Sequence, residues 1–163
     1  MTLSLRTAPK KAVDCVLTAL QLRVADGKSA LLGGALDIAK PIPRYRGDPE
    51  SLRTTARITP KGWAILLVGE DRNVLAGSLT IGNRYEFAGL ATGGYADTLL
   101  AAATLAAELF ENDPEPYRVA LIESDRSPWI ALLVEGRTSS YLIDLIHGVL
   151  VPSDAVEHRL RDT

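Results

Sequence analysis

The sequence predicts an α+β domain in which a single antiparallel sheet of about five strands has helices packed on it. Apolar runs of strand length alternate with clusters of turn-forming residues in the second half of the chain. Two segments show the three- and four-residue apolar spacing of helices. The chain has 163 residues, of which 47% are hydrophobic and 23% charged, as is usual for one globular unit. We therefore expect residues 1–163 to form a single domain, and no internal repeat is visible in them.

The first helix is expected after Thr7, a typical N-cap residue, with Pro9 in the first turn where its missing N–H costs nothing. It ends at Gly27, because glycine favours a helix C-terminus. Its apolar stripe consists of Val13, Val16, Leu17, Leu20 and Val24. The stretch 29–40 contains a Gly-Gly pair, which weakens a helix, and an apolar run without strand alternation. Its structure is therefore left open.

The next segment, residues 41–61, is predicted to be a basic loop. Regular structure is interrupted there by Pro41, Pro43, Pro49 and Pro60. Between Lys40 and Lys61, six basic residues stand against two acidic ones. Residues 52–58 favour a short edge strand within it. We expect the segment to contact an anionic partner through Arg44, Arg46, Arg53 and Arg57.

Five strands are expected in the second half of the chain. Two apolar runs, 62–68 and 74–81, flank a turn cluster and predict a β-hairpin. After a glycine-containing connection and a helix, turns separate three more strands at 117–123, 129–135 and 138–146. A short helical segment, 155–161, closes the chain. The predicted order is therefore helix, hairpin, helix, three strands.

The central helix is predicted from Asp97, which can cap it, to about Phe110. One apolar stripe consists of Leu99, Ala103, Ala106 and Phe110. The rest of the circumference is also apolar, through Leu100, Leu105 and Leu109. A helix that is apolar nearly all round must be covered on more than one side.

Few residues are suited to catalysis or to metal binding. Cys15 is the only cysteine, which excludes an internal disulfide or a cysteine cluster and favours a reducing cytoplasm. The two histidines, His147 and His158, are not beside a recognisable nucleophile. The glycines between Gly89 and Gly94 lack both the Walker lysine and the dinucleotide-binding spacing. We therefore expect no catalytic residue, no cofactor and no metal.

The formal net charge of −2 favours neither nucleic acid nor a membrane surface as a partner. No apolar run approaches the length of a membrane span, and no signal-peptide pattern is expected at the N-terminus. The acidic residues gather in the second half of the chain, opposite in sign to the basic segment. A solvated rim is expected from Glu108, Glu111, Asp113 and Glu115. This asymmetry suits complementary contact with a protein.

Residues 62–146 resemble the roadblock/dynein light chain family, which has a profilin-like order of helix, hairpin, helix and three strands. The resemblance is carried by WAILLVGEDRNVLAGSL (63–79), ADTLLAAATLAAELF (96–110) and the closing strands VALIESDRSPWIALLVEGRTSSYLIDLI (119–146). It implies a homodimer in which the long helices of two subunits pack together and strand 117–123 pairs with its mate. The implied interface consists of Leu99, Leu100, Leu105, Leu109, Tyr117 and Val119.

We therefore predict a non-enzymatic, dimeric interaction module in the cytoplasm. The resemblance implies that its partner, besides a second copy, is a small GTPase or another protein. One alternative is a ligand-binding sensory domain that holds a small molecule between the helix at Ala96 and the sheet. Another is a secretion-chaperone-like dimer, because a strand at 52–58 would give the order helix, three strands, helix, strands, helix.

Overall fold

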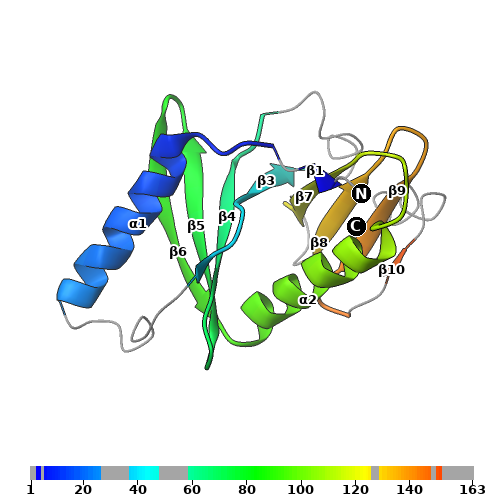
Figure 1. The fold of residues 1–163 in the computed structure, drawn as a ribbon. Coiled ribbons are helices and arrows are strands. Elements are labelled where there is room, and N and C mark those ends of the chain that lie inside the picture. The colour runs from blue at the N-terminus through cyan, green and yellow to red at the C-terminus, as the bar shows by residue number, and fades with distance from the viewer. Residues whose placement is uncertain are drawn as a thin grey trace.

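A mixed β-sheet with a helix on each face forms the described part of the protein (Figure 1). The computed structural model describes residues 3–4, 6–26, 37–47, 59–125, 129–147 and 150–151. The helices are α1 (Lys10–Ala25) and α2 (Gly94–Leu109). The strands are β1 (Leu3–Ser4), β2 (Asp37–Ile38), β3 (Ile42–Gly47), β4 (Gly62–Val68), β5 (Asn73–Ile81), β6 (Arg84–Thr92), β7 (Tyr117–Ser124), β8 (Ile130–Glu135), β9 (Ser140–Asp144) and β10 (Leu150–Val151).

The strands follow one another across the sheet in the order β10-β9-β8-β7-β3-β4-β5-β6, with β1 beside β7 and β2 beside β4. Neighbours along this path are antiparallel except at its centre, where β3 and β7 are parallel and Arg44 lies opposite Leu121. Each strand of this parallel pair is the first of four strands that follow one another antiparallel across the sheet. In the sequence, a helix precedes each of these two runs. Apart from the two-residue strands β1 and β2, the described chain thus consists of two halves with the same order, α1 with β3–β6 and α2 with β7–β10.

The predicted sheet of about five antiparallel strands in helix-hairpin-helix order was wrong, because β3 and β6 were not foreseen. β3 lies in the segment predicted to be a proline-containing loop. Pairing of β3 with β7 begins at Arg44, one residue after Pro43, so the missing proline N–H removes no hydrogen bond to β7. β6 replaces the expected glycine-containing connection and turns the hairpin into a three-stranded meander.

A β-bulge allows β6 to pair despite its glycine, Gly89. The register between β5 and β6 shifts between Gly77 and Ser78, which leaves Ala88 without a partner across the strands. Gly89, next to it, has a φ of +133°, which favours glycine. The predicted edge strand 52–58 and the predicted helix 155–161 lie outside the described residues.

The two helices cover opposite faces of the sheet (Figure 1). Side chains alternate along β4, so that Ile65 packs with Val16 of α1, whereas Leu66 belongs to the cluster around Leu99 of α2. α2 contacts β5 and β6 of the first half and β8 of the second. These strands belong to one sheet, and Ala101, Thr104 and Glu108 of α2 are exposed, so the cover on a second side stays a prediction. A third cluster, around Ile122, lies on the other face of β7 and β8.

Two of the carboxylates expected in a solvated rim make specific hydrogen bonds after α2. Glu115 accepts hydrogen bonds from the backbone N–H of Arg137 and, at 3.1 Å each, from the backbone N–H and the hydroxyl of Thr138. Asp113 accepts hydrogen bonds of 2.9 Å from the backbone N–H of Glu115 and the hydroxyl of Tyr117. The bonds of Glu115 fasten the loop after α2 to the turn between β8 and β9, and those of Asp113 hold the same loop to the start of β7.

We expect Glu115 to make the stability of the fold depend on pH. The backbone N–H of Arg137, helped by Thr138, holds the pKa of Glu115 below its ordinary value of 4.5. A lowered pKa in the folded state contributes stability above the ordinary value, and this contribution is lost as the pH falls through the folded-state pKa. In chemical denaturation, Glu115→Gln should therefore be less stable than the wild type at neutral pH, with a smaller difference in acid.

Glu108→Gln is the matched control, because Glu108 is exposed on α2 and its carboxylate makes no hydrogen bond with another described residue. Its stability should follow that of the wild type at both pH values. A stability difference for Glu115→Gln that stays the same in acid would contradict the role given to the ionised carboxylate.

Candidate functional site

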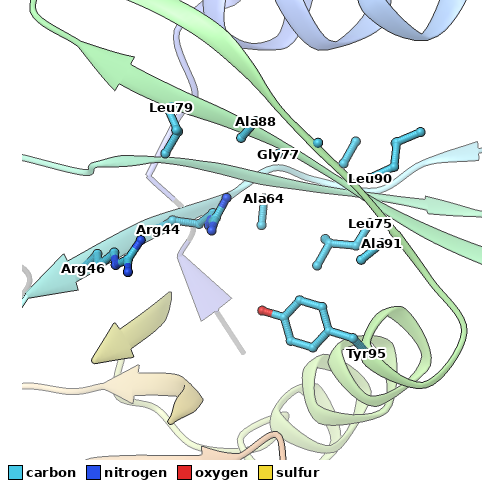
Figure 2. Close-up of a pocket in the computed structure, with 12 residues that line it drawn as sticks. Arg44, Arg46, Ala64, Leu75, Gly77, Leu79, Ala88, Leu90, Ala91 and Tyr95 are labelled. Carbon is cyan, nitrogen blue, oxygen red and sulfur yellow. The ribbon is translucent and has the colours of Figure 1, made fainter. Parts of the chain in front are cut away.

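A cavity of about 330 Å³ opens on the α2 face of the first half of the sheet (Figure 2). It lies between β3, the β5–β6 hairpin and the first turn of α2. The residues that line it are Arg44, Arg46, Ala64, Leu75, Ala76, Gly77, Leu79, Ala88, Gly89, Leu90, Ala91 and Tyr95. Two guanidinium groups and one phenol thus face an otherwise apolar surface.

The floor of the cavity is flat because small residues meet there. Gly77 of β5 lies opposite Gly89 of β6, so no side chain projects from either strand at this point. Ala64 of β4 pairs with Gly77 from the other side. Leu75 and Leu79 border this floor along β5 (Figure 2). The floor is therefore an open apolar surface made by the glycines and by Ala64.

Arg44 reaches over this floor from β3. The parallel pairing of β3 with β7 places Glu123 beside it, and Nε and Nη2 of Arg44 donate to Oε1 of Glu123 at 3.2 and 2.7 Å. The two side chains are only 22% and 14% exposed. A Cβ atom on Gly77 would come within 2.8 Å of Nη1 of Arg44. The ion pair thus holds the guanidinium with Nη1 against the glycine floor.

Arg46 is held less firmly at the mouth of the cavity. Its Nε lies 2.8 Å from Oδ1 of Asp125, but the two side chains are 62% and 51% exposed. Exposed ion pairs of this kind contribute little stability, because water screens them. Arg46 can therefore turn toward a bound group at small cost.

Tyr95 stands opposite the arginines, in the first turn of α2. Gly93, with a φ of +70°, lets the chain turn from β6 into this helix. The Tyr95 hydroxyl points across the cavity (Figure 2), and its oxygen is buried without a hydrogen-bond partner in the described part of the chain. Burial, and then the charge of Glu123, raises the pKa of Tyr95 to about 12, although Arg44 opposes the shift. The phenol therefore stays protonated at neutral pH and is available as a donor.

The structure brings two of the four predicted partner-binding arginines together. Arg44 and Arg46 both line the cavity, whereas Arg53 and Arg57 lie outside the described residues. Neither Tyr95 nor the floor of the cavity was predicted from the sequence. Glycines inside β5 and β6 were the available signal for the floor, because glycine within a strand often marks a bulge or a close approach.

The residues of the predicted dimer interface occupy different environments. Leu99, Tyr117 and Val119 are buried in the core of the chain itself, and Leu100 and Leu105 pack partly against that core. Leu109 is 49% exposed. β7 pairs with β8 along one edge and with β1 and β3 along the other. Within the described structure, β7 therefore has no free edge for the pairing with a second subunit that the resemblance implied.

The remaining candidate residues lie apart from the cavity. Nδ1 of His147 is 3.0 Å from Oδ2 of Asp144, whose Oδ1 accepts hydrogen bonds from the backbone N–H groups of Ile146 and His147. This arrangement shapes the turn after β9. His158 lies outside the described residues, and the Cys15 thiol donates to the carbonyl oxygen of Ala12 within α1.

Over the described residues, no group of three or more histidine, cysteine or acidic side chains is placed to hold a metal ion. In the same part of the chain, neither α1 nor α2 has the length and apolar character needed to cross a membrane. Comparison of the chain with protein-family models, curated proteins and solved structures gives no match. The roadblock resemblance therefore stays a prediction.

We expect Leu109→Asp to dissociate any dimer that forms through the exposed face of α2 while leaving the chain folded, because Leu109 is half exposed. Leu99→Asp should instead unfold the chain, since it would bury an unpaired charge at a cost of several kcal/mol. Light scattering at micromolar concentration gives the mass, and circular dichroism checks the fold. A monomeric wild type would contradict the predicted homodimer, and an unchanged dimer in Leu109→Asp would exclude this face as its interface.

Proposed function

We propose that this chain is a non-enzymatic binding domain that holds a small ligand in the cavity between α2 and the sheet. One observation carries the proposal: the buried hydroxyl of Tyr95, without a partner among the described residues, faces an arginine that Glu123 holds in place. A buried hydroxyl without a hydrogen bond costs about 1–3 kcal/mol. A ligand with an acceptor oxygen at this point would recover that free energy.

The size and the lining of the cavity support the same function. Small-molecule sites begin at roughly 300 Å³ and combine apolar surface with a few convergent polar groups. This cavity, of about 330 Å³, has the same combination in its alanine and glycine floor, Arg44 and Tyr95. A guanidinium and a protonated phenol are groups that bind and orient an acceptor.

The proposed function corresponds to one alternative predicted from the sequence, a ligand-binding sensory domain with a small molecule between the helix at Ala96 and the sheet. A second copy and a small GTPase as partners stay predictions, as does the secretion-chaperone-like dimer. A cytoplasmic location is part of the proposal, because the single free cysteine, Cys15, suits a reducing compartment.

We expect small aromatic and aliphatic molecules, screened by NMR at millimolar concentration, to shift the amide signals of Gly77, Gly89 and Ala91. Ala88→Phe should abolish these shifts. Ala88 is exposed at the rim of the cavity, so a phenyl ring there would fill the opening without disturbing the core.

Ala101→Phe is the matched control, because Ala101 is exposed on α2 and is not part of the cavity lining. It should bind the molecules as the wild type does. Equal shifts in Ala88→Phe and in the wild type would locate the binding elsewhere. If no molecule in the set shifts the three amide signals of the wild type, the cavity is rejected as a binding site.

A further inference from the structure

The charged groups that the described residues place around the cavity balance one another. Arg44 is paired with Glu123 and Arg46 with Asp125, so two positive side chains stand against two negative ones. A ligand group with several negative charges, such as a polyphosphate, would meet no excess of positive charge here. Arg46 alone is held by an exposed pair that it can leave at small cost, so the described residues can offer one positive charge to a ligand, and this favours a ligand with one negative charge.

Two hydrogen-bond donors face the cavity from opposite sides, one on Arg44 and one on Tyr95. Nε and Nη2 of Arg44 are both engaged by Glu123, which leaves Nη1, beside Gly77, turned to the cavity. The hydroxyl of Tyr95 points toward it from the other side (Figure 2). A carboxylate presents two acceptor oxygens, and hydrogen bonds between charged partners are the stronger ones.

We infer that the ligand carries a single carboxylate, bound between Nη1 of Arg44 and the hydroxyl of Tyr95, on a flat apolar body that rests on the glycine and alanine floor. This inference rests on the proposed function. The flat body follows from the floor, since Gly77 and Gly89 meet without side chains and Leu75 and Leu79 border them. An aromatic ring can lie on such a surface, and benzoate is therefore the simplest probe.

The test is an NMR titration of the full chain with benzoate, methyl benzoate and phenyl phosphate. Methyl benzoate keeps the ring and the carbonyl but lacks the charge, and phenyl phosphate adds charge and bulk. Benzoate should bind at least about tenfold more tightly than methyl benzoate, as expected for hydrogen bonds to a charged group. Phenyl phosphate should bind no more tightly than benzoate.

Tyr95→Phe removes only the hydroxyl and should weaken benzoate binding by about tenfold. Tyr85→Phe is its control, because Tyr85 lies on β6 without lining the cavity, and it should bind benzoate as the wild type does. Circular dichroism of both variants separates a loss of binding from a loss of fold.

Two kinds of failure are distinguishable. If methyl benzoate or phenyl phosphate binds more tightly than benzoate at the cavity, or if Tyr95→Phe has no effect, the carboxylate inference is overturned while the binding function stands. The same holds if other molecules shift the cavity signals and benzoate does not. If neither benzoate nor any molecule of the wider set shifts the signals of Gly77, Gly89 and Ala91, the proposed function itself fails.

Discussion

The parallel pairing of β3 with β7 is the constraint on which the rest of the described structure depends. It joins two antiparallel runs of strands into one sheet through the residues from Arg44 to Gly47 and from Leu121 to Ser124. The segments it unites are far apart in the chain, so their pairing must offset a large loop-closure entropy. The cluster around α2 offsets it, because Leu66 and Leu75 of one half and Leu132 of the other pack together there.

The same pairing also builds the site. Glu123 meets Arg44 only because their strands lie side by side with parallel direction, and the ion pair then sets which nitrogen of the guanidinium faces the cavity. α2 lies across both halves and brings Tyr95 to the opposite wall. The cavity is thus a product of the junction between the halves, and Tyr95 and Glu123 are both far in sequence from the arginines of β3.

Local patterns predicted most elements but not their assembly. The apolar run 62–68 coincides with β4, and the central helix and the strands β5 and β7 begin and end within a few residues of their predicted limits. β3 and β6 were not predicted, because proline and glycine indicate turns when a segment is considered alone. Whether a strand can contain a proline or a glycine depends on how the neighbouring strands pair with it. Charge pointed to Arg44 and Arg46, since charge is visible in a sequence. Tyr95 was not foreseen, because its meeting with Arg44 depends on the fold.

The bulge beside the cavity also affects the margin of the sheet. β6 is the last strand on its side of the described sheet, and such a strand offers unpaired backbone groups to other chains. The unpartnered Ala88 and the positive φ of Gly89 interrupt the regular spacing of those groups, and Arg84 and Glu86 add charge at its beginning. The irregular spacing of its backbone groups therefore makes β6 a poor template for the uncontrolled addition of strands from other chains.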